Sequence, residues 1–159
     1  MKKINVLLLA IVLAFIPSVS FAISNAELNE QLSNIQSKKF SKIEKYLNDN
    51  KTKLASDPEY FVLLLNYVMW KGDRSGVVVA KGKPSSGDLE LRDQDTGEVV
   101  GFVGSREAYD DALMIDGIRR TQKAIKEFNS RLDIHFGIIA VAERIKRWDI
   151  VGEIGRAHV

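Results

Sequence analysis

Side chains suited to acid–base, nucleophilic or metal chemistry are scarce in this chain. The sequence contains two histidines, His135 and His158, and no cysteine. A zinc site, a cysteine nucleophile or a histidine-based triad is therefore hard to assemble. His135 lies in a predicted helix with no carboxylate arranged around it in the sequence, so we interpret it as a packing or helix-surface residue.

Two polar loops share only part of the pattern of known ligand-binding loops. Asp93-Gln-Asp-Thr-Gly-Glu98 alternates carboxylates before a glycine, as calcium loops do, but it lacks a third alternate ligand and a distant bidentate glutamate. A hairpin turn explains all of its residues. Gly82-Lys-Pro-Ser-Ser-Gly87 differs from a phosphate loop because its lysine precedes the serines. We therefore assign no catalytic, cofactor-binding or metal-binding residue and expect no cofactor.

The segment from Glu59 to Trp70 is apolar nearly all round, which predicts a helix that is buried on most sides. Aromatic side chains on such a helix could line a peptide groove, although an apolar stripe of this density is usually core. The aromatic residues in question are Tyr60, Tyr67 and Trp70.

Apolar residues recur at helical spacing in other parts of the chain. The segments are 26–35, 43–47 with an extension towards Leu54, 108–128, 132–145, and a last helix that opens at Trp148. Capping residues fit these limits: Ser24 or Asn25 can cap the first helix, Asp57-Pro58 can start the apolar helix, and Gly72 can end it. The first two helices are expected to form an antiparallel pair with a short turn.

Three short segments between residues 76 and 103 have the composition of strands. They are Gly76–Ala80, Asp88–Arg92 and Glu98–Val103, and they are separated by turn-forming residues at 83–87 and 93–97. We therefore predict a small antiparallel β insertion at 76–103, with a hairpin connection at its second turn.

The first 22 residues have the three parts of an export signal. Lys2-Lys3 precede an apolar run from Ile4 to Ile16, and Ser20-Phe21-Ala22 supplies small residues for cleavage before Ile23. The apolar run is shorter than the roughly 20 residues that cross a bilayer. We therefore predict a cleaved signal peptide at 1–22 and an exported, periplasmic mature chain without stable membrane insertion.

The mature chain would be nearly neutral. Without Lys2 and Lys3, the 23 basic residues of the sequence fall to 21, which equals the number of acidic residues. Such a balance gives no electrostatic footprint for nucleic acid. About 137 residues would remain, which is one domain's worth. Because cysteine is absent, the domain must be stabilised by its core rather than by disulfides.

The last seven residues, Glu153-Ile-Gly-Arg-Ala-His-Val159, match the in-frame translation of a common sequencing adapter. We therefore expect that the gene was cut short, that residues 154–159 are a non-native tail, and that the helical domain covers 23–153. The alternative is a genuine, frayed C-terminus. Finding the same seven codons after re-amplification of the locus would contradict the adapter origin.

Several segments have the residue types of a helix-turn-helix repeat. Phe136-Gly137 matches a large residue and a glycine that lets a neighbouring helix approach, and Lys146–Asp149 matches the following turn with an aromatic residue. Lys38–Ser41 has a similar turn some 108 residues earlier, and Asp57–Tyr60 matches the start of a repeat. On these segments the chain resembles tetratricopeptide-repeat proteins, whose unit of roughly 34 residues is two antiparallel helices. It also resembles exported bacterial repeat proteins of unknown role in which such an insertion precedes a segment like Asn129–Asp133.

The resemblance implies a mainly α fold of antiparallel helix pairs, a tetratricopeptide-like α-solenoid that binds a protein or peptide partner along its concave side. Two departures are the spacing from Gly137 to Trp148, which is about two residues longer than usual, and Ala140 at a usually aromatic position. A scaffold is favoured over an enzyme. The alternatives are a cell-envelope enzyme, with its site in the β insertion or in a missing C-terminal part, and a structural subunit of an envelope assembly.

Overall fold

The computed structural model describes residues 22–156, apart from the side chain of Ala124. The predicted signal peptide up to residue 21 lies outside these residues, as do the last three residues of the predicted tail with His158. The described chain is mainly helical and carries one small antiparallel sheet, which confirms the predicted fold class at this level. Its elements are α2 (Asn25–Gln36), α3 (Phe40–Asn50), α4 (Pro58–Gly72), β1 (Gly76–Ala80), β2 (Leu89–Arg92), β3 (Val99–Arg106), α5 (Asp111–Ile125), α6 (Leu132–Arg144) and α7 (Trp148–Arg156).

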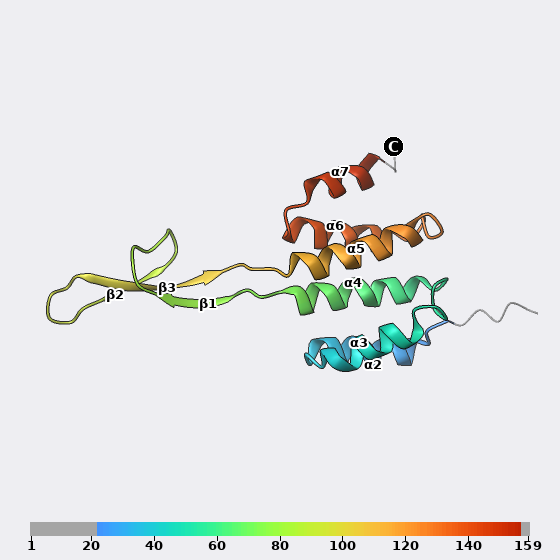
Figure 1. Cartoon of the computed structure of the whole chain (residues 1–159), viewed down its shortest axis with the longest axis horizontal. Coiled ribbons are helices and arrows are strands. Elements are labelled where there is room, and N and C mark those ends of the chain that lie inside the picture. The colour runs from blue at the N-terminus through green and yellow to red at the C-terminus, as the bar shows by residue number, and fades with distance from the viewer. Residues whose placement is uncertain (1–21, 157–159) are drawn as a thin grey trace, which may run out of the picture.

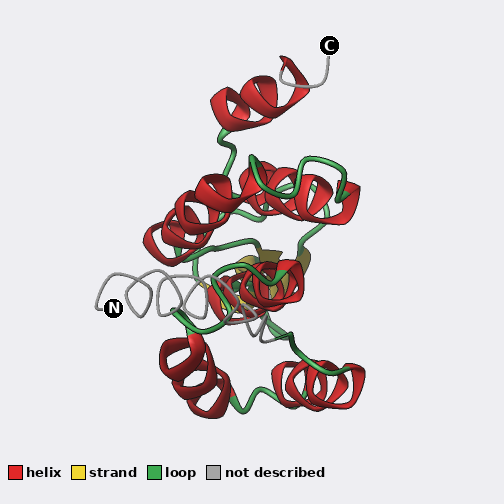
Figure 2. Ribbon diagram, turned by 90° about the vertical axis from the view of Figure 1, so that its right-hand side faces the viewer, coloured by secondary structure: helices red, strands yellow, loops and turns green. Residues whose placement is uncertain are grey.

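The helices form three consecutive pairs: α2 with α3, α4 with α5, and α6 with α7. The first helix of each pair also contacts the first helix of the next pair, since α2 packs on α4 and α4 packs on α6. Among the described helices, the backbones of α3 and α5 do not pack directly on each other, and neither do those of α5 and α7. Figures 1 and 2 show the resulting stack, with α2 and α3 at one end and α7 at the other. Each pair therefore packs only on its neighbours in the sequence.

α4 is buried on most sides, as predicted, and it contacts α2, α3, α5 and α6. Asp57 caps its start by accepting a hydrogen bond from the Glu59 backbone N–H at 2.9 Å. The Tyr60 hydroxyl donates to the carbonyl oxygen of Leu47 on α3 at 3.1 Å and accepts from Arg120 of α5 at 2.7 Å. Tyr60 therefore joins three helices at the first turn of α4.

The turns inside the first and third pairs have the same backbone geometry. Lys38 and Lys146 both adopt a left-handed conformation, with φ of 56° and 57°. In each turn the N–H of this lysine bonds to the carbonyl three residues earlier, and the next N–H bonds to the carbonyl five residues before it. The similarity of these two segments, predicted from the sequence, therefore extends to the backbone.

Gly137 and Gly117 allow helices to approach closely. A Cβ atom on Gly137 would lie 2.8 Å from Cδ1 of Leu65, so α6 packs against α4 with no room for a side chain there. A Cβ atom on Gly117 would lie 2.8 Å from both γ-methyl groups of Val68, where α5 meets α4. The predicted close approach at Gly137 is confirmed.

The predicted end of the apolar helix at Gly72 is confirmed, although Gly72 is not itself the cap. It is the last residue of α4 rather than a cap with positive φ, and Asp73 follows it as the cap. A Cβ atom at Gly72 would lie 2.9 Å from Cε of Met114 on α5. The missing side chain at Gly72 therefore leaves space for Met114 between α4 and α5.

α5 is shorter at both ends than the predicted helix at 108–128. The carbonyl oxygen of Ala108 accepts a hydrogen bond from the Arg74 N–H at 2.8 Å, and Tyr109 pairs with Asp73 in an antiparallel bridge. These contacts keep the chain extended up to the start of α5. They form a stem that joins the sheet to the ends of α4 and α5.

The insertion is a three-stranded antiparallel sheet with the strand order β1-β3-β2. β3 is central and pairs with all of β1, from Gly76↔Arg106 to Ala80↔Phe102, so it continues past the predicted end at Val103. None of the three strands contacts a described helix. Figure 1 shows the sheet projecting away from the helices, and we call residues 75–107 the arm.

The predicted tail is only partly described. Residues 154–156 continue α7, and the side chain of Ile154 is buried. Packing does not test where the DNA for these residues came from, so the adapter origin stays a prediction.

Replacing Gly117 with alanine is expected to destabilise the fold. The new methyl group would overlap Val68, a buried β-branched side chain with little rotamer freedom. Overpacking of this kind costs about 1–3 kcal/mol, which exceeds the gain of up to about 1 kcal/mol from replacing a helical glycine. Urea unfolding of the two proteins measures the difference.

Gly152→Ala is the matched control, because the nearest atom to a Cβ at that position is Nη1 of Arg156, at 3.8 Å. This variant should gain roughly 0.5–1 kcal/mol from helix propensity alone. A Gly117→Ala protein as stable as the original chain would contradict the close approach of α4 and α5.

Candidate functional site

The arm has two chemically different faces, because side chains alternate along a strand and paired residues share a face. The strand register places Val79, Val103 and Leu89 in one row across the three strands. Val77 and Leu91 lie two residues from this row along β1 and β2, so they point to the same side. We call these five residues the apolar face of the arm.

The apolar face is largely open to solvent. Val77, Val79 and Leu89 expose 74%, 67% and 71% of their surface, and no described helix covers them. Exposed apolar patches on a soluble protein commonly mark interaction sites. A small sheet also needs a covered apolar face to be stable by itself. The apolar face is therefore a candidate binding surface.

The opposite face is closed by interactions within the arm. Arg106 donates to both carboxylate oxygens of Asp88, at 2.8 and 2.7 Å, and its guanidinium lies 5.1 Å from the centre of the Phe102 ring. The Arg106 guanidinium and the Ser85 backbone N–H lower the pKa of Asp88 to about 2. The pair fills the space above Gly104, where an added Cβ would overlap the Asp88 carboxylate.

The loop that shares part of the calcium pattern folds as a hairpin turn. Asp93 Oδ1 accepts hydrogen bonds from the backbone N–H groups of Asp95 and Thr96, at 3.0 and 2.8 Å, and Gly97 supplies a positive φ of 72°. These bonds lower the pKa of Asp93. The predicted hairpin is therefore confirmed. Among residues 22–156, no group of three histidine, aspartate or glutamate side chains is placed to hold a metal ion.

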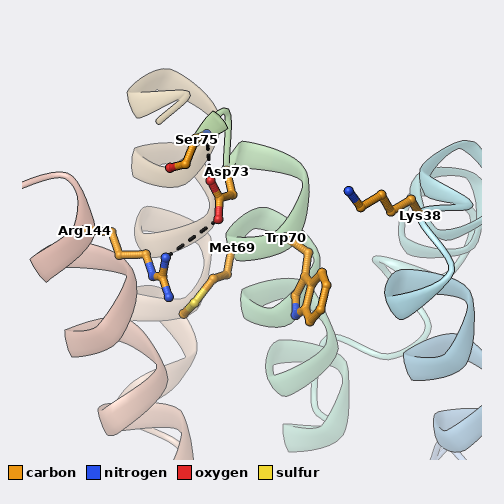
Figure 3. A pocket seen from close by; sticks show the side chains of 6 residues that line it. All are labelled: Lys38, Met69, Trp70, Asp73, Ser75 and Arg144. Atoms are coloured by element: carbon orange, nitrogen blue, oxygen red, sulfur yellow. Dashed lines mark hydrogen bonds and ion pairs between the residues drawn. The ribbon is translucent and has the colours of Figure 1, made fainter. Parts of the chain in front are cut away.

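A pocket of about 400 Å³ lies at the base of the arm, near the C-terminal ends of α2, α4 and α6 (Figure 3). Figure 3 shows Trp70 on the side of Lys38, and Met69 on the side of Arg144. Trp70 exposes 45% of its surface, which is unusual for so large a side chain on the most apolar helix. The lining residues are Lys38, Met69, Trp70, Asp73, Ser75 and Arg144.

The stem of the arm contributes the interactions that position the charged side chains of the pocket. Asp73 accepts a hydrogen bond from the Ser75 N–H at 2.9 Å and forms an ion pair with Arg144 at 3.8 Å. The Ser75 hydrogen bonds lower the pKa of Asp73, and the positive charges of Arg144 and Lys38 add to this effect. An aromatic side chain flanked by two cations can bind a partner segment in which an apolar side chain lies next to a carboxylate.

The candidate residues from the sequence lie in different environments. Tyr60 and Tyr67 are buried in the core, whereas Trp70 lines the pocket. His135 is buried on α6, in agreement with a packing role. Sequence reasoning missed the apolar face, although the alternation at Leu89 and Leu91 was a signal for it.

Within the described part of the chain, no helix combines the length and the apolar character needed to cross a membrane. Comparisons of the chain with protein-family models, curated proteins and solved structures find no match. A function must therefore be inferred from the chain's own surfaces, which are the apolar face of the arm and the pocket at its base.

Proposed function

We propose that the chain is an exported scaffold that binds a protein or peptide partner in the cell envelope. The single observation that carries the proposal is the apolar face of the arm, which no described element covers. Export rests on the leader at 1–22 with its cleavage position before Ile23. A periplasmic location follows from that leader.

A tetratricopeptide-like solenoid is part of the proposal. In such arrays each helix pair contacts only its neighbours, and an extended surface is left for binding. Three observations support this assignment: the neighbour-only contacts of the pairs, the matching turns at Lys38 and Lys146, and the close approach of α6 to α4 at Gly137.

The two candidate surfaces are adjacent, so one partner can occupy both. β1 begins at Gly76, directly after Ser75, which lines the pocket. β1 is an edge strand, because only β3 pairs with it, and Gly76–Ala80 contains no charged residue. Uncharged edge strands readily accept another strand. An extended segment of the partner would pair with β1, place its own apolar side chains beside Val77 and Val79, and extend towards Trp70.

The double substitution Val77→Thr with Val79→Thr should abolish most partner capture. Threonine keeps the strand propensity of valine but places hydroxyl groups on the apolar face. We expect about a tenfold or greater loss of partner recovered from periplasmic extract, measured by cross-linking, affinity purification and quantitative mass spectrometry.

The matched control is Lys81→Thr with Lys83→Thr, which changes the same number of arm residues outside the apolar face. This control should recover the same proteins as the original chain. Equal recovery by both double variants, or empty recovery by all three proteins, would count against the arm as a binding element.

Trp70→Ala should weaken partner binding by roughly 2 kcal/mol or more, because exposed tryptophans in pockets act as binding hot spots. Trp148→Ala is its control, since Trp148 is also exposed but does not line the pocket. Binding is measured by titration with the partner identified from the extract. If both alanine variants bind equally well, the pocket is not part of the interface.

A further inference from the structure

Asp57 is a buried carboxylate that forms no ion pair within residues 22–156. It exposes 5% of its surface. Its Oδ1 atom caps α4, and its Oδ2 atom accepts a hydrogen bond from the backbone nitrogen of Ile23 at 2.5 Å. A buried carboxylate that lacks a countercharge is costly. A positively charged group near the Oδ2 atom would therefore stabilise this carboxylate.

Ile23 is the first residue after the predicted signal peptide. Its side chain is buried in the core, whereas Ala22 is exposed. Hydrolysis of the Ala22–Ile23 peptide bond adds water across it. The new carboxylate leaves with the leader, and the nitrogen of Ile23 takes up protons to become an ammonium group. The single neutral donor that faces Asp57 then becomes a cation with three N–H donors.

We propose that the ammonium group released at Ile23 by signal-peptide removal forms a buried ion pair with Asp57 and completes the folded mature chain. The inference rests on the proposed export and cleavage. It goes further in assigning the cleaved terminus a structural partner, 34 residues away at the start of α4.

The surroundings of Asp57 favour a positive charge. Burial raises the pKa of the Tyr46 hydroxyl on α3, and the negative charges of Glu27 on α2 and Asp57 raise it further. Glu59, in the first turn of α4, is already paired with Arg131 at 2.8 Å. The Ile23 ammonium would therefore lie near two acidic residues, Asp57 and Glu27, that both act on the Tyr46 hydroxyl.

The ion pair would also fix the order of the helix stack. Ile23 directly precedes Ser24, which caps α2 by accepting from the Glu27 N–H at 3.2 Å. Asp57 caps α4. A bond between Ile23 and Asp57 therefore ties together the starts of two neighbouring first helices. Cleavage at any other bond would leave the charge in a different place.

The test compares three forms of the mature chain: one that begins with a free Ile23, one acetylated at Ile23, and one with a single glycine before Ile23. A fusion removed by a protease that leaves no extra residue supplies the first form. At pH 7 we expect the free form to have at least about a tenfold larger folding equilibrium constant than the other two, from urea unfolding. Equal stability of the free and acetylated forms would overturn the proposal.

The pH dependence of the stability difference distinguishes the ion pair from a packing effect. An α-amino group has a pKa of about 7.7–8 in the unfolded chain, and pairing with Asp57 raises it in the folded chain. The extra stability of the free form is therefore fully present below about pH 7.7 and is lost as pH rises through the folded value. Groups such as Tyr46 titrate in both forms, so the difference between free and acetylated chains isolates the terminus.

Asp57→Asn removes the charge and keeps a residue that can cap α4. In this variant the free and acetylated forms should be equally stable, whereas Asp116→Asn, at an exposed carboxylate of α5, should preserve their difference. A difference that survives in Asp57→Asn would overturn the assignment of the partner.

The processing step is checked separately by the intact mass of the full-length gene product recovered from the periplasm. A mature chain that begins at Ile23 supports the proposal, and a chain cut at another bond overturns it. Loss of partner capture by the arm variants would not affect either result, so failure of the binding proposal is distinguishable from failure of the ion pair.

Discussion

The burial of α4 on nearly every side is the constraint on which the rest of the structure depends. A helix that is apolar all round cannot face water, so it must be covered by neighbours on both sides. α2 and α3 cover it from one side of the stack, and α5 and α6 from the other. The two ends of α4 then become the places where polar chemistry can occur. Asp57 lies at the first end, while Trp70, Asp73 and the stem of the arm lie at the second.

The arm differs from the helices in where its apolar side chains lie. The helices bury their apolar residues within the chain, whereas the arm leaves one apolar face open to solvent. The Asp88–Arg106 pair covers Gly104 on one side, but Val77, Val79 and Leu89 lie open on the other. A partner that covers them would stabilise the arm as well as bind it, since any ligand of the folded state shifts the folding equilibrium.

Local signals in the sequence predicted much of this fold. The apolar helix, the cap at Asp57 and the hairpin at Asp93 each depend on residues a few positions apart, and the structure confirms them. The limits of α5 could not be predicted, because Tyr109 pairs with Asp73 across the stem. The end of α4 at Gly72 was predicted, but the contact between this glycine and Met114 was not, because Met114 comes from another helix. Contacts between distant segments decided each of these cases.

The polar residues of the arm bear on the choice between a scaffold and an enzyme. A catalytic group must be free to reach a substrate, but three carboxylates of the arm are engaged by their own neighbours. Asp88 is held by Arg106, Asp93 by the backbone of its turn, and Glu90 by Arg92. The arm also presents an open row of aliphatic side chains, Val77, Val79 and Leu89, which can bind a surface but cannot transfer a proton. This open aliphatic row is the feature of the arm that supports the binding proposal.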